Sequence, residues 1–466
     1  MRGFRVLVAA ALGAGALAFG VGAAPLGSAP ATANAQLVGH VNPGGGYSAD
    51  VYAHRGHAYL SSWRGGSCPA LGVRIYSLAD PRKPRLTATF ADARSDPEVA
   101  GSWTEKTIVQ RVQTPSFTGD LAATSFQSCG DGGFQGFGLY DVTDPTKPRK
   151  LALVPTEPRG VHEIWLQARG DRAYVYAAIP FSELLSSADF DAKTRKATIP
   201  GEPDFRIFDV SDPVNTTQVG EWGAWTELGV HPNNGRGRFL KSNFAHSVTV
   251  DASATRAYVA YWDLGTVTLD ISNPAAPRYV GRTGTTSEPE GDAHSVWLGN
   301  GGRLLVETHE SSTGRPTFYD ISNSARPRRL GALALPSPGQ PARGLGLSVH
   351  DPEIVGGRAY FSWYSQGVVV ADVSRASRPR RIAQFVPQPT LDREGTLCEK
   401  RACVMTWGVD VEGGYVLASD MVSGLWVFRV GKGTRTLTAS PAAEGTRVVA
   451  SREDPSRRRF LCVPGL

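Results

Sequence analysis

The chain has 466 residues and a formal net charge of +6; 41% of its residues are hydrophobic and 20% are charged. This balance excludes an intrinsically disordered chain and is ample for a large hydrophobic core. The 53 Gly and 32 Pro make up roughly 18% of the chain against a usual share of about 12%, so the composition favours many short strands over long helices.

Residues 1–35 have the pattern of a secretory signal peptide. Two arginines precede the apolar run 6–24, and small residues follow up to Ala35, so cleavage is predicted before Gln36. A transmembrane anchor is the alternative, but the run is rich in Ala and Gly and the cleavage pattern follows closely. We therefore expect a secreted or extracytoplasmic protein with no membrane span in its mature chain.

The charge of the mature chain gives no sign of a nucleic-acid partner. Removal of Arg2 and Arg5 with the leader lowers the formal charge from +6 to +4. The sequence also has no stripe of Lys and Arg, which a protein that binds nucleic acid would need.

A segment with a period of about fifty to seventy residues dominates the sequence. It has the form Tyr-Asp-Val-Thr-Asp-Pro, in which Asp, Ser and Thr bond their own backbone and Pro cannot continue a strand, so each copy should end a strand. Four clear copies begin at Tyr140, Phe208, Leu269 and Tyr319, and three weaker copies lie at 76–84, 371–379 and 425–430.

Each copy belongs to a unit of four strands. Two strand-like runs joined by a tight turn precede it, such as 353–355 and 358–363, and a short run that begins with Arg follows it. Units of this period predict the blades of a β-propeller, with a solenoid as the alternative. Residues 37–39 resemble an outer strand that lies before the first unit, whereas the seventh unit lacks one, so this strand would complete the last blade and close the ring.

The expected fold class is therefore all-β: a seven-bladed β-propeller of four-stranded antiparallel blades over residues 36–430. Residues 431–466 show little periodicity and are expected to form a C-terminal tail that is partly disordered.

The recurring segment resembles the LVIVD repeat of secreted and surface β-propeller proteins of bacteria. The resemblance covers most of the mature chain and implies the propeller architecture, but no particular reaction, because the family has no single established one. The end units depart from the pattern, with Ser77-Leu78 in place of Asp-Val in the first and Arg429-Val430 in the seventh.

The cysteines predict two disulfides in an exported protein. Cys398 and Cys403 lie in one loop and suit a local bridge. Cys68 and Cys129 occupy equivalent loops between the second and third strands of adjacent blades, so we expect them to pair. Cys462, in the tail, is left over.

The long connections are all expected on one face of the ring. They lie between the second and third strands of a blade or between blades, and comprise 90–102, 181–204, 223–243, 283–292 and 386–404. Long loops on a rigid scaffold commonly carry function. The sequence therefore favours a secreted binding or interaction module, with a protein, a glycan or a small molecule as its ligand.

Four histidines occupy one repeat position, at the start of the innermost strand, in four consecutive blades: His162, His246, His294 and His350. Imidazoles that converge on the channel axis could hold a divalent or redox-active transition metal. Three carboxylates at the outgoing end of the second strand, on the same face, would orient them: Asp263, Glu310 and Asp420.

The alternative is that these histidines are part of the repeat itself, each hydrogen-bonded to a turn of the neighbouring blade. The metal hypothesis makes a metal-dependent, oxidative enzyme the second candidate function. No catalytic residue is assigned, because the sequence contains no GxSxG, HExxH or P-loop motif.

Overall fold

The computed structural model describes residues 32–431 except 66–67, 130–131, 157–158, 181–189, 192, 195, 198–202, 233–234, 236–241, 285–290, 312–313 and 335–347. Most of the predicted signal peptide (1–31), the tail (432–466) and Cys462 thus lie outside the described residues.

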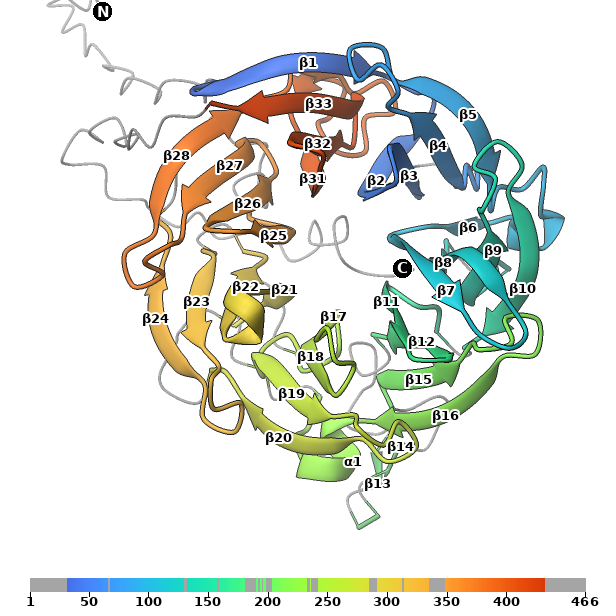
Figure 1. Cartoon of the computed structure of the whole chain (residues 1–466), viewed down its shortest axis with the longest axis vertical. Coiled ribbons are helices and arrows are strands. Elements are labelled where there is room, and N and C mark those ends of the chain that lie inside the picture. Colours follow the sequence, from blue (N-terminus) through green and yellow to red (C-terminus); the bar gives the residue numbers. More distant parts are fainter. Residues whose placement is uncertain are drawn as a thin grey trace, which may run out of the picture.

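Seven antiparallel sheets form a ring around a central channel (Figure 1), which confirms the predicted all-β, seven-bladed propeller. Six of the sheets have four strands, and the second has a fifth short strand, β6 (Ser102–Trp103). The first blade consists of β2 (Tyr47–His54), β3 (His57–Trp63), β4 (Val73–Ser77) and β5 (Arg85–Phe90). The second consists of β7 (Thr107–Gln113), β8 (Thr118–Ser128), β9 (Gly136–Asp141) and β10 (Arg149–Pro155). The third consists of β11 (Glu163–Arg169), β12 (Arg172–Ala178), β15 (Phe205–Asp209) and β16 (Thr217–Trp222). The fourth blade consists of β17 (Ser247–Val250), β18 (Arg256–Ala260), β19 (Thr266–Asp270) and β20 (Arg278–Arg282). The fifth consists of β21 (Ala293–Gly299), β22 (Leu304–His309), β23 (Thr317–Asp320) and β24 (Arg328–Ala332). The sixth consists of β25 (Pro352–Val355), β26 (Arg358–Trp363), β27 (Gly367–Asp372) and β28 (Arg380–Phe385). The seventh holds β31 (Thr406–Glu412), β32 (Tyr415–Asp420), β33 (Gly424–Val430) and β1 (Ala35–Val41).

The remaining elements belong to the connections. They are β6 (Ser102–Trp103), which pairs with β8, the short hairpins β13 (Phe190–Asp191) with β14 (Lys196–Ala197) and β29 (Thr390–Leu391) with β30 (Ala402–Cys403), the helix α1 (Ala224–Leu228), and the 3₁₀ turns Pro97–Val99 and Asn300–Gly302.

The seventh sheet combines the two ends of the propeller. Its outer strand β1 pairs antiparallel with β33, from Ala35 opposite Val430 to Val41 opposite Leu425. Just upstream, the Asn34 side chain donates to the carbonyl of Ile382 in β28. Residues that the predicted cleavage before Gln36 would remove thus contact the sixth and seventh sheets.

The aspartate of the recurring segment makes two kinds of contact. In five blades one carboxylate oxygen accepts the backbone N–H two residues later, which forms an Asx turn at the end of the third strand; these are Asp141, Asp209, Asp270, Asp320 and Asp372. In four of these blades the other oxygen reaches an arginine that opens the outer strand, as in Arg328–Asp320 at 2.8 Å and Arg380–Asp372 at 3.0 Å. In the third blade Asp209 instead reaches Arg172, which opens the second strand. The turn therefore fixes where the third strand ends and the outer strand begins.

Neighbouring blades approach closely at a glycine in the outer strand. A Cβ on Gly220 of β16 would lie 2.0 Å from the carbonyl oxygen of Pro274, in the third-to-fourth-strand turn of the next blade. A Cβ on Gly39 of β1 would meet Pro81 of the first blade in the same way, at 2.1 Å. Only glycine leaves room for the neighbouring turn at these positions.

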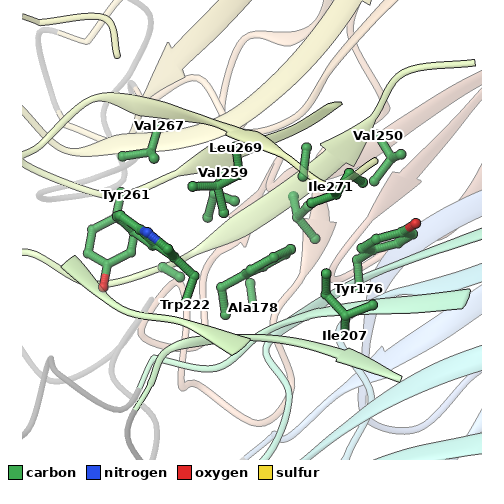
Figure 2. Close-up of a cluster of buried hydrophobic side chains, with 14 of the residues drawn as sticks. Tyr176, Ala178, Ile207, Trp222, Val250, Val259, Tyr261, Val267, Leu269 and Ile271 are labelled. Carbon is green, nitrogen blue, oxygen red and sulfur yellow. The ribbon is translucent and has the colours of Figure 1, made fainter. Parts of the chain in front are cut away.

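Apolar side chains from facing sheets fill the space between blades. Figure 2 shows the cluster between the third and fourth blades, in which Tyr176, Ile207 and Trp222 face Val259 and Tyr261. Because both faces of every sheet are covered in this way, the strands read as nearly continuous apolar runs. Among the described residues, no helix is long and apolar enough to cross a membrane.

Both predicted disulfides are confirmed. Cys68 bonds Cys129 and so links the second-to-third-strand loops of the first two blades, and Cys398 bonds Cys403 within the connection between the sixth and seventh blades.

We expect Gly220→Ala to lower the free energy of unfolding by about 1–3 kcal/mol, because the new methyl group would overlap the Pro274 carbonyl. The control is Gly357→Ala, where the added Cβ meets nothing nearer than 3.6 Å. Urea unfolding measures both. Equal stability of the two variants would contradict the proposed close approach of the blades.

Candidate functional site

Seven aromatic side chains form a closed belt around the channel axis, with one from each blade. We call this set the axial belt; in cyclic order it consists of Trp63, Trp103, His162, His246, His294, His350 and Trp407. The four histidines predicted from the repeat are thus brought together, in sequence order. The ring centroids of neighbouring histidines are 4.0–4.3 Å apart. The ring centroids of neighbouring tryptophans, and those of Trp103 and His162, are 6.1–6.4 Å apart.

The belt follows from the position of these residues on their strands. His162 and His246 immediately precede β11 and β17, and their backbone N–H groups donate to Ala178 and Ala260, so each side chain is fixed at the start of an innermost strand. Trp407 occupies the same position in β31. In the first blade this position holds the small Ala49, and Trp63 from the end of β3 completes the belt instead.

All seven side chains of the belt are buried, and the four histidines are at most 3% exposed. Burial lowers the pKa of His162 to about 3 and that of His350 to about 4, and it lowers the pKa of His246 and His294 well below the ordinary value. The imidazoles are therefore neutral at physiological pH, which is the state in which histidine binds metals.

Each of three histidines has one ring nitrogen held by a neighbour. His162 Nδ1 lies 2.6 Å from the side-chain oxygen of Gln127, and His246 Nδ1 lies 3.0 Å from the backbone oxygen of His294. His294 Nδ1 lies 2.7 Å from Ser295 Oγ. The Nε2 atoms of His162 and His246 are 2.9 Å apart.

A charged cluster lies next to the belt, and its three carboxylates stand one residue further along their strands. The Lys106 ammonium is 3.0 Å from Asp351, 3.1 Å from Glu163 and 3.3 Å from Asp50. The side chain of Lys106 is only 12% exposed, so one cation is enclosed by three carboxylates from three other blades. We call these four residues the Lys106 cluster.

The Lys106 cluster controls the charge beside the belt. Burial lowers the pKa of Lys106, but its carboxylate neighbours outweigh burial and raise that pKa well above the ordinary value. Burial raises the pKa of Asp50 to about 7 and that of Glu163 well above normal, whereas for Asp351 burial is outweighed by Lys106, His350 and the Ser295 hydroxyl, which lower its pKa. Asp351 is thus the carboxylate of the cluster with the lowest pKa.

Asp351 connects the cluster to the belt. Its Oδ2 faces Lys106, and its Oδ1 accepts the Ser295 hydroxyl at 2.5 Å and lies 3.6 Å from His350 Nδ1. A change of charge in the Lys106 cluster will therefore change the electrostatic potential at His294 and His350.

Of the three carboxylates expected behind the histidines, the structure brings Glu310 to them. Glu310 Oε2 lies 3.7 Å from His294 Nε2. Asp263 accepts the backbone N–H groups of Ser242 and Asp292, and Asp420 accepts those of Met405, Val422 and Ser423, so both fix loop backbone.

Four residues near the belt were not predicted from the sequence: Asp351, Lys106, Glu163 and Asp50. Three of these four directly follow the belt position of their own blade, so the repeat alignment that found the histidines could have found them at the next position. Trp63 and Trp103 carry no such signal, because they reach the belt from other places in their blades.

The connection before the seventh blade and the loop that holds Cys129 lie on the belt's side of the ring. Cys398, Leu397, Cys129 and Met405 pack in one cluster with the three tryptophans of the belt, and the Tyr47 hydroxyl bonds Asp392 in the connection before the seventh blade. The loops and the belt therefore share one face.

Comparison with known proteins finds a family model that matches part of the chain. Residues 248–285, which run from β17 to just past β20, match the family described as LVIVD repeat. The protein is thus a seven-bladed β-propeller with an LVIVD repeat. No curated protein matches the chain. A similar solved structure is that of the computationally designed Ika8 protein, with 6% sequence identity and a TM-score of 0.46 over 85% of this chain and 100% of that chain.

Removal of the buried cation tests the Lys106 cluster. We expect Lys106→Met to destabilise the fold by about 3–5 kcal/mol at pH 8, because it leaves three buried carboxylates without their counter-charge. This loss of folding free energy should become smaller as the pH falls towards 5. There the folded variant binds protons at Asp50 and Glu163, whose pKa values are already raised, before the unfolded chain does.

Chemical denaturation at pH 5 and pH 8 measures this change. The control is Arg82→Met, which removes an exposed partner of Asp80 and should change stability little at either pH. A Lys106→Met penalty that is independent of pH would show that the carboxylates do not share the charge of Lys106.

Proposed function

We propose that the protein is an exported β-propeller module that binds its ligand over the mouth of the channel, on the face that carries the long connections. A protein, a glycan or a small molecule would meet the same surface there. Export is supported by the two disulfides, which persist in oxidising compartments, and by the signal-peptide pattern of residues 1–35.

The observation that carries the proposal is the asymmetry between the two faces. The third-to-fourth-strand turns are short Asx turns, whereas both disulfides and the packed cluster around Cys398 and Met405 lie in connections on the belt face. Cross-linked loops are ordered before a ligand arrives, which reduces the entropy lost on binding.

Hydrogen–deuterium exchange tests which face binds. The full-length mature protein would be screened by thermal shift against a panel of soluble oligosaccharides, short peptides and small organic acids. Each compound that raises the melting temperature would then be mapped. We expect protection in residues 64–72, 91–103 and 386–405, and none in the opposite turns at 79–84 and 143–148. Hits that protect only those turns, or blade grooves away from the loops, would contradict the proposal.

A metal-dependent, oxidative enzyme is the second candidate function. It is supported by the neutral, buried histidines of the belt and by Glu310 beside them. Oxygen uptake by metal-loaded protein, lost in the His246→Ala/His294→Ala double variant, would favour this candidate over a pure binding module.

A further inference from the structure

We propose that the Nε2 atoms of His246 and His294, together with the Glu310 carboxylate, form a binding site for one divalent transition-metal ion. This site goes beyond the ligand-binding function and does not depend on it. In a neutral imidazole one nitrogen carries the hydrogen, and only the other nitrogen can bind a metal.

His246 has its hydrogen on Nδ1. That nitrogen lies 3.0 Å from the backbone oxygen of His294, which can only accept a hydrogen bond. Since the imidazole is neutral, Nε2 is left with a free lone pair.

His294 is fixed in the same form through Ser295 and Asp351. The Ser295 hydroxyl lies 2.5 Å from Asp351 Oδ1 and donates to it, because this carboxylate is ionised beside Lys106. Ser295 Oγ then accepts from His294 Nδ1 at 2.7 Å. His294 Nε2 therefore carries a lone pair; it is completely buried and has no hydrogen-bond partner among the described residues. A buried polar atom without a partner is costly unless something binds it.

His162 leaves the lone pair of His246 Nε2 available. Its Nδ1 donates to the Gln127 side-chain oxygen at 2.6 Å, so its Nε2, which lies 2.9 Å from His246 Nε2, carries a lone pair and no hydrogen. His162 therefore donates no hydrogen bond that would compete with an ion for His246 Nε2.

The donor atoms indicate the kind of ion. Two imidazole nitrogens and one carboxylate oxygen suit first-row transition-metal ions such as Cu²⁺, Fe²⁺ and Zn²⁺. Imidazole donors also disfavour Ca²⁺ and Mg²⁺, which prefer oxygen.

Glu310 supplies the oxygen ligand. Its Oε2 lies 3.7 Å from His294 Nε2, and ligand atoms of His246, His294 and Glu310 all lie within 4.8 Å of one another. The other oxygen of Glu310 accepts the Tyr364 hydroxyl, which orients the carboxylate. Asp351, near His294 and His350, is less suited as a ligand because it already accepts from Lys106 and Ser295.

Titration of the metal-free mature protein with Cu²⁺, followed by electron paramagnetic resonance, tests the site. We expect one tightly bound ion per chain, with hyperfine splitting from its nitrogen ligands. His294→Gln should weaken binding about 100-fold or more. The control, His57→Gln, changes a histidine outside the belt and should bind Cu²⁺ as the unmodified protein does.

A second variant guards against misfolding and tests the tautomer argument. Gln127→Glu keeps an acceptor for His162 Nδ1, so it should leave Cu²⁺ affinity nearly unchanged. If Gln127 instead donates its amide N–H to His162, then His162 Nε2 holds the hydrogen and donates it to His246 Nε2. The Glu carboxylate can only accept, so the variant would move this hydrogen to Nδ1 and bind Cu²⁺ markedly more tightly than the unmodified protein. That gain would overturn the proposal, as would the absence of stoichiometric Cu²⁺ binding or binding that His294→Gln does not weaken.

Discussion

The central constraint on this protein is that seven sheets meet at one axis. Whatever side chain stands at the start of an innermost strand is buried against its copies from the other blades, and polar groups there must satisfy one another because water cannot. In this chain the first such position contributes four neutral imidazoles and Trp407 to the axial belt, and the next position contributes the three carboxylates that enclose Lys106.

The two layers depend on each other. Lys106 keeps Asp351 ionised, Asp351 accepts the Ser295 hydroxyl, and Ser295 in turn accepts from His294. A single buried ammonium group thus sets the tautomer of a histidine in the neighbouring layer. The order of residues along the strand, histidine first and charge second, is therefore a chemical arrangement as well as a repeat pattern.

Much of the fold could be predicted from the sequence because its signals are local. An Asp that bonds the backbone two residues later, followed by Pro, marks the end of each third strand, and the spacing of these marks gives the number of blades. The Cys68–Cys129 bridge was predictable for the same reason, since the two cysteines hold equivalent loop positions. The four histidines were also found through their shared repeat position.

The rest of the site depends on side-chain directions that the sequence does not encode locally. Trp63 reaches the belt from the far end of β3, and Lys106 is surrounded by carboxylates that lie 56, 57 and 245 residues away in the chain. Asp263 and Asp420 stand at the same strand end as Glu310, yet their carboxylates bind loop backbone. Only Glu310 turns towards the histidines.

The most direct test of this account is nuclear magnetic resonance of ¹⁵N-labelled histidine in the metal-free mature protein at pH 7, with each signal assigned by a His→Gln variant. The ¹⁵N shifts report which nitrogen of each ring carries the hydrogen. The account predicts hydrogen on Nδ1 and a free Nε2 for His162, His246 and His294. Hydrogen on Nε2 of His162 or His294 would contradict it, and the histidines would then be part of the blade structure alone.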